Sequence, residues 1–122
     1  MNQTFGKRIR EARQNKGYSQ RDLAGLVKVD YTYLSKLEND RAEYAPKEEV
    51  IKLLAHHLEL DAEELIYFAG RITSEDAKVV QELAKTYQKQ MPVLLRQMRD
   101  NPELTQKFIR EATQAESEEK ST

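Results

Sequence analysis

The sequence contains no cysteine, which excludes disulfide bonds and thiolate ligands for a metal ion. It also has few residues that interrupt helices, with four glycines and three prolines among 122 residues. No stretch approaches the roughly 18 continuous apolar residues of a membrane-spanning helix, and the N-terminus lacks the apolar run of a signal peptide. We therefore expect neither a disulfide-stabilised secreted domain nor a membrane protein, and we expect the chain to work in the cytoplasm.

Hydrophobic residues make up 39% of the chain and charged residues 34%, a balance typical of a helix-rich globular protein. A chain of this length forms one domain, or one small domain with an appendage, because a single core usually spans about 100 to 150 residues. We therefore predict an all-α fold.

The net charge of −1 hides a gradient along the chain. Residues 1–45 carry nine Lys and Arg against six Asp and Glu, whereas residues 46–73 carry three against six and residues 74–122 carry eight against nine. An anionic partner is therefore expected to meet the first third of the chain, where positive charge is in excess.

Five short helices are predicted in the first 70 residues, because apolar residues recur there at helical spacing. The first is expected over residues 4–15, the fourth begins near Pro46, and the fifth spans residues 62–69 and ends at Gly70. Between the second and third helices, residues 28–29 leave room only for a tight turn, which predicts a helix-turn-helix. Capping residues precede three of the helices, namely Ser19 with Asp22, Asp30, and Asp61 with Glu64.

The pattern of apolar residues over 74–113 predicts a helical extension with three further apolar stripes. Residues 114–122 are expected to form a disordered tail. Pro92 and Pro102 fit the first turns of two of these helices. About forty residues cannot easily close a core of their own, so the stripes must pack on the first domain or on a second copy of the chain. We favour a homodimer formed through residues 74–113; the alternative is that these helices thicken the core of the monomer.

The stretch DYTYLSKLEND, residues 30–40, divides into two faces on a helical wheel. Leu34 and Leu37 lie on one side and predict an anchor. The other side contains no carboxylate and presents side chains that form hydrogen bonds or stack, namely Tyr31, Thr32, Ser35, Lys36 and Asn39. Such a helix fits the major groove of B-DNA, although the wheel alone leaves a protein-binding face open.

Residues 20–39, QRDLAGLVKVDYTYLSKLEN, resemble the helix-turn-helix of the Xre family, the lambda-repressor and Cro-like DNA-binding domains. The resemblance includes KGYSQRDLA, residues 16–24, which overlaps the start of the motif, and PKEEVIKLLAHHLELDAEEL after it. It implies a five-helix DNA-binding domain over residues 4–70, with the motif at about residues 20–39, followed by the helical extension.

The resemblance also implies roles for individual residues. The positions that contact bases hold Tyr31, Thr32 and Lys36. The positions that contact the DNA backbone hold Ser19, Gln20, Tyr33, Asn39 and Arg41, and Gln20 would also brace the third helix. Arg13 and Glu38 would form an internal ion pair, because a carboxylate on the buried edge of a helix needs a cation.

The chain departs from the family at several positions. Lys28, Asp40 and Glu59 stand where glycine is common, and Lys47 stands where a capping Ser or Thr is frequent. If the backbone at the first of these positions is left-handed, Lys28 costs about 1 kcal/mol relative to glycine. The turn between the two motif helices could instead be reshaped.

Nothing in the sequence predicts catalysis, a metal site or a cofactor. His56 and His57 are adjacent on a helix and point about 100° apart, so they cannot chelate one ion together with ordinary geometry. The chain has no glycine-rich phosphate loop, and no combination of Ser, His and acid stands out. We expect a protein that is not an enzyme.

Together these features predict a sequence-specific transcription regulator that binds double-stranded DNA. We expect a repressor that binds a pseudo-palindromic operator as a homodimer, with the third helix in the major groove, and that associates with the nucleoid in a bacterial or phage-type setting. The alternative is a protein-interaction module, antitoxin-like or a complex subunit, in which DNA binding is weak or secondary.

Overall fold

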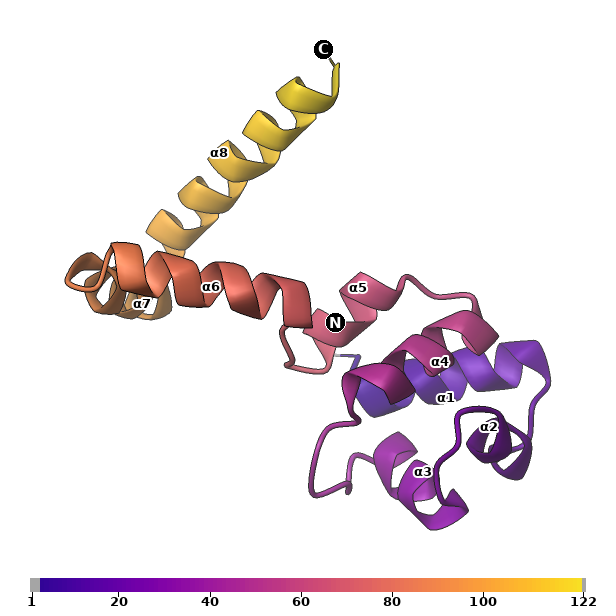
Figure 1. Cartoon of the computed structure of the whole chain (residues 1–122). Coiled ribbons are helices and arrows are strands. Elements are labelled where there is room, and N and C mark those ends of the chain that lie inside the picture. Colours follow the sequence, from indigo (N-terminus) through magenta and orange to yellow (C-terminus); the bar gives the residue numbers. More distant parts are fainter. Residues whose placement is uncertain (1–2, 122) are drawn as a thin grey trace. The chain divides into compact units, whose positions relative to one another are not determined.

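The computed structural model describes residues 3–121 and contains, over that range, eight α-helices and no strand (Figure 1). The all-α prediction is therefore confirmed. The chain divides into two compact units, and the division falls between Asp76 and Ala77. Within the described residues, no helix is both long enough and apolar enough to cross a membrane.

The first unit contains five short helices in the order that the sequence predicted. They are α1 (Phe5–Lys16), α2 (Gln20–Leu26), α3 (Tyr31–Glu38), α4 (Glu48–Leu58) and α5 (Ala62–Phe68). Thr4 caps α1 by accepting a hydrogen bond from the Lys7 amide, and Gly17 ends this helix with a φ of 77°. Helix α1 thus begins and ends at capping residues that can be identified in the sequence.

Two of the predicted caps form hydrogen bonds and one does not. Ser19 and Asp22 form a complete capping box, with hydrogen bonds of 3.0 and 3.2 Å. Asp61 accepts a hydrogen bond of 2.9 Å from the Glu64 amide at the start of α5. Asp30 occupies the capping position of α3, but its side chain makes no capping hydrogen bond there.

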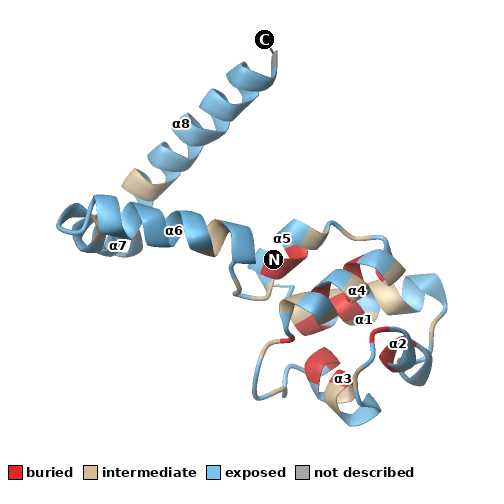
Figure 2. Ribbon diagram, in the orientation of Figure 1, coloured by how far each residue is buried: buried red, intermediate tan, exposed pale blue. Residues whose placement is uncertain are grey.

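The core of the first unit is made by one face of each of these helices (Figure 2). Burial of a Leu or Ile side chain stabilises a fold by roughly 1.5 to 3 kcal/mol, so this cluster is the main source of its stability. Its buried members are Ile9, Leu23, Ala24, Val27, Leu34, Leu37, Ile51, Leu54, Ala55, Leu58, Leu65 and Ile66.

Helix α4 begins two residues later than the sequence suggested. The expected start was Pro46, but the helix begins at Glu48 and Lys47 occupies its capping position without a side-chain hydrogen bond. The reason is a long-range contact, because the Arg71 guanidinium donates hydrogen bonds to the carbonyls of Ala45 (2.7 Å) and Pro46. These carbonyls are held outside the helix by a residue that lies 26 and 25 positions further along the chain.

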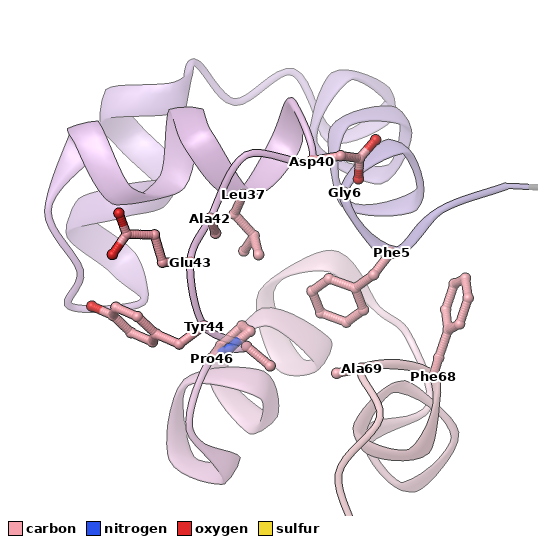
Figure 3. A pocket seen from close by; sticks show the side chains of 11 residues that line it. Phe5, Gly6, Leu37, Asp40, Ala42, Glu43, Tyr44, Pro46, Phe68 and Ala69 are labelled. Carbon is pink, nitrogen blue, oxygen red and sulfur yellow. The ribbon is translucent and has the colours of Figure 1, made fainter.

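The loop after α3 borders a shallow hollow of about 270 Å³ on the first unit (Figure 3). Phe5 at the start of α1 and Phe68 at the end of α5 lie on its opposite side, with their rings in edge contact at 6.0 Å. Pro46 is buried at its base, whereas Tyr44 is 64% exposed. The loop is held by residues outside it, because the Tyr33 hydroxyl of α3 donates to the Tyr44 carbonyl and Arg71, which follows α5, donates to the carbonyls of Ala45 and Pro46.

The second unit consists of most of α6 (Ser74–Thr86), together with α7 (Gln90–Asp100) and α8 (Pro102–Ser121). Pro92 and Pro102 lie in first turns, as predicted. None of the residues from Ala77 to Lys120 is buried (Figure 2). The large exposed apolar side chains of the second unit are Val79, Val80, Leu83, Tyr87, Val93, Leu94, Leu95, Phe108 and Ile109.

The tail differs from the expectation of disorder over residues 114–122. Helix α8 continues to Ser121, and Thr122 lies outside the described residues. The segment contains three glutamates, one alanine and one lysine, which favour helices, and it carries a hydrogen bond from Gln114 to Glu118 and an ion pair between Glu116 and Lys120. Pairs spaced four residues apart support a helix without any tertiary contact.

Candidate nucleic-acid interface

The helix-turn-helix pair is held together by buried leucines and valine. Leu23 on α2, Val27 in the turn and Leu34 on α3 are completely buried. Leu37 is 7% exposed, so the anchoring face predicted for α3 is confirmed. The opposite face of α3 is free to present its side chains.

Lys28 lies in this turn with a φ of 61°, and Asp40 and Glu59 have φ values of 59° and 57°. All three positions therefore keep the left-handed backbone for which glycine is suited, although each carries a side chain. The turn between α2 and α3 is not reshaped to avoid this strain. Asp40 is additionally held by Thr4, whose hydroxyl donates a 2.9 Å hydrogen bond to its carboxylate.

Glu38 is a carboxylate with 1% of its surface exposed, at the end of α3. The structure brings it together with Arg13, whose Nε and Nη2 donate to the two carboxylate oxygens at 2.7 and 2.9 Å. Gln20 donates a third hydrogen bond of 3.0 Å, and the Arg10 Nε lies 3.7 Å away. This cluster joins α1, α2 and α3 and satisfies a charge that would otherwise be costly to bury.

The three residues expected to contact bases lie on the exposed side of α3. Thr32 and Lys36 are exposed, and Tyr31 is 39% exposed. The Arg21 guanidinium of α2 lies over the Tyr31 ring, 4.6 Å from its centroid. The structure therefore brings these residues together on one surface, and it adds an arginine to them.

The residues expected to contact the DNA backbone lie at the start of α2, on α3 and just after it, and several are engaged within the chain. Gln20 bonds Glu38, and Ser19 accepts a hydrogen bond from the Asp22 amide. Asn39 donates to the Ser35 carbonyl at 2.8 Å and accepts from Arg10. These bonds fix the orientation of the side chains and leave other lone pairs and donors available.

Tyr33 is stacked on Tyr44, with ring centroids 5.0 Å apart, and its hydroxyl donates a 3.0 Å hydrogen bond to the Tyr44 carbonyl. Partial burial raises the pKa of the Tyr33 hydroxyl above its ordinary value, and the neighbouring Tyr44 adds to the rise. The raised pKa favours the protonated phenol, which is the form that donates this hydrogen bond. Arg41, in contrast, is exposed in the loop that follows α3.

Three residues that the sequence did not single out contribute to this arrangement. Arg10 joins the Glu38 cluster, and its spacing of three residues from Arg13 was the only signal. Arg21 was not distinguished from other surface arginines. Gly6 allows α1 to approach α3, because a Cβ at this position would lie 2.2 Å from the Leu37 carbonyl oxygen. A glycine inside a helical pattern hinted at such an approach.

The described residues contain no group of three or more His, Asp or Glu side chains placed to hold a metal ion. The rings of His56 and His57 meet edge to face with centroids 5.0 Å apart. The hollow beside the loop after α3 has a mixed polar and apolar lining, which includes Asp40, Glu43 and Tyr44.

A family model described as a helix-turn-helix domain matches residues 6–70, more than half of the chain. Among solved structures, the biofilm master regulator SinR in complex with DNA is 28% identical, with a TM-score of 0.46, and the match covers 52% of this chain and 98% of that one. A complex of the SinR and SinI proteins is 23% identical, with a TM-score of 0.47 and coverage of 85% and 99%.

A third similar structure is the clp gene regulator ClgR from Corynebacterium glutamicum. It is 29% identical, with a TM-score of 0.45, and the match covers 72% of this chain and 90% of that one. No curated protein matches the chain.

Proposed function

The chain belongs to the helix-turn-helix domain family, in its Xre type of DNA-binding transcription regulators rather than enzymes, and from this premise we propose that it is a homodimeric repressor. Each subunit places α3 in the major groove of one half of a pseudo-palindromic operator. Two-fold symmetry then sets the half-sites about one helical turn, roughly 34 Å, apart. A bound dimer represses by blocking access of polymerase to the promoter.

The observation that carries this proposal is the division of α3 into two faces. Leu34, Leu37 and Glu38 hold one face in the fold, while the other is exposed and has no carboxylate. The major groove admits an α-helix and offers donor and acceptor patterns that differ between base pairs. In this proposal Lys36 donates to guanine, and Thr32 bonds a base edge or touches a thymine methyl.

Contacts to phosphate set the register of the complex without reading the sequence. We assign them to Ser19, Gln20, Tyr33, Asn39 and Arg41, which lie at the start of α2, on α3 and just after it. Gln20 has the further task of bracing α3 through Glu38. Its loss should therefore weaken binding to every duplex.

The dimer is assigned to the extension, residues 74–113. Its helices α6 and α7 contain no buried residue, and their apolar side chains remain exposed in the single chain. Such faces need a partner surface, and a second copy of the chain supplies a matching one. In sedimentation, the full chain should behave as a dimer and a chain shortened to residues 1–73 as a monomer.

The same exposed apolar faces support a second candidate, a protein-interaction module in which DNA binding is weak. The two candidates differ in their response to salt, because phosphate contacts make affinity fall steeply as ionic strength rises. Binding to duplex DNA that is no stronger at low salt than at high salt would refute the regulator and favour the module.

Selection of bound duplexes from a random pool tests the regulator directly. The expected product is a two-fold symmetric sequence with half-sites one turn apart. Lys36→Ala and Thr32→Ala should then relax discrimination at particular base pairs, whereas Gln20→Ala should lower affinity for selected and random duplexes alike. Equal losses on both kinds of duplex for all three variants would contradict the assigned roles.

A further inference from the structure

Arg21 is an exposed arginine in the first turn of α2 that the interactions of the first unit leave available. Among the described residues its guanidinium forms no ion pair. The adjacent carboxylate of Asp22 is engaged with the Ser19 amide and lies in the capping box. What Arg21 does contact is the ring of Tyr31, with the guanidinium carbon 4.6 Å from the ring centroid.

This contact places a cation against the first residue of α3. An arginine over an aromatic ring is attracted by the negative face of the ring, and the contact restricts a long side chain that would otherwise sample many rotamers. The guanidinium keeps its N–H donors when it lies on a ring, since the ring accepts through its face. Tyr31 therefore holds a set of unused donors beside Thr32 at the exposed end of α3.

We propose that Arg21 reads a guanine in each half-site and that Tyr31 positions it. This inference rests on the proposed DNA-binding function and identifies a residue of α2 as a source of its specificity. Arginine bonding to guanine O6 and N7 is the commonest specific contact in the major groove. Tyr31 begins the helix that enters the groove, so an arginine carried on its ring lies beside base edges.

The competing role for Arg21 is a contact to phosphate. Two residues beside it on the chain, Ser19 and Gln20, already supply polar groups for that purpose at the start of α2. The two roles differ in where affinity is lost. Loss of a phosphate contact weakens binding to every duplex, whereas loss of a contact to guanine weakens binding only to duplexes that carry that G·C pair.

The test compares variants of the full chain on the operator selected from a random pool and on duplexes with single base-pair changes. Arg21→Ala should lower affinity for the operator by about 5- to 150-fold, which is the value of one paired base contact. On a duplex in which one particular G·C pair per half-site is replaced, wild type and Arg21→Ala should bind equally. Arg21→Lys should restore at most part of the preference, because lysine donates to guanine without the planar fork of arginine.

Tyr31 is tested by two substitutions that separate the ring from the hydroxyl. Tyr31→Leu should weaken the guanine preference, because the support for Arg21 is gone, and Tyr31→Phe should restore it. Lys52→Ala removes an exposed positive charge from α4, outside the surface of α2 and α3, and serves as the control for charge alone. Thermal unfolding of each variant checks that the fold is intact.

Three results would overturn the assignment. If Arg21→Lys restores affinity and Arg21→Ala loses it equally on all duplexes, Arg21 contacts phosphate. If Arg21→Ala selects the same operator as the wild type with the same affinity, Arg21 makes no contact, although the regulator stands. If the wild-type chain selects no sequence at all, the proposed function fails and this inference fails with it.

Discussion

Gly6 lies where α1 passes the end of α3, and a methyl group there should shift the two helices apart. A Cβ built at Gly6 would lie 2.2 Å from the Leu37 carbonyl oxygen and 2.6 Å from the Asp40 carboxylate. The first of these is a backbone atom, which cannot rotate away. Overpacking of this kind costs about 1 to 3 kcal/mol, and each kcal/mol lowers the Tm of a small domain by roughly 4 to 8 °C. Gly6→Ala should therefore lower the Tm by roughly 4 to 24 °C.

The matched control is Gly25→Ala in α2, where an added Cβ meets no atom within 4 Å. Because alanine is the better helix former, this variant should be stabilised by up to about 1 kcal/mol. Thermal unfolding followed by circular dichroism measures both. If Gly6→Ala unfolds at the wild-type temperature, α1 and α3 are not in the close contact that the structure describes.

Three further predictions concern other features of the first unit. Lys28→Gly should stabilise the fold by about 1 kcal/mol and Lys28→Ala should not, because only glycine relieves the left-handed backbone; equal effects in urea titrations would point to the charge instead. Glu38→Gln should cost about 3 kcal/mol, since it leaves Arg13 part-buried and without its partner; a loss below about 1 kcal/mol would show the charge to be dispensable. Hydrogen bonds from Ser74 lower the pKa of Glu48 in the folded protein. The ionised carboxylate therefore stabilises the fold at pH values above its ordinary pKa of 4.5, and this stabilisation is lost as the pH falls through the lowered pKa. The unfolding temperature should then fall less with decreasing pH in Ser74→Ala than in the wild type. Identical pH profiles would refute the contact between Ser74 and Glu48.

Features that depend on neighbouring residues in the chain could be predicted from the sequence. The capping box at Ser19, the stop at Gly17 and the two faces of α3 follow from local spacing, and the structure has all of them. The sequence did not decide whether Lys28 has a left-handed backbone, because its φ depends on the conformation of the turn between α2 and α3.

Features that depend on distant residues could not be predicted. Helix α4 starts late because Arg71 occupies the carbonyls that precede it, and nothing near Pro46 signals this. Asn39 looked free for phosphate, yet Arg10 bonds its amide oxygen from another helix. The pairing of Arg21 with Tyr31 likewise joins residues ten positions apart, which no helical repeat connects.

The Glu38 cluster and the contact of Thr4 with Asp40 have a consequence for the energetics of association. They attach the C-terminal end of α3 to α1 and α2 before any partner is present. A helix that is already in place loses little backbone entropy when it enters a groove. Much of the ordering cost of complex formation then falls on exposed side chains such as Lys36 and Arg41. We therefore expect little change in the backbone of α3 between the free and bound states of the first unit.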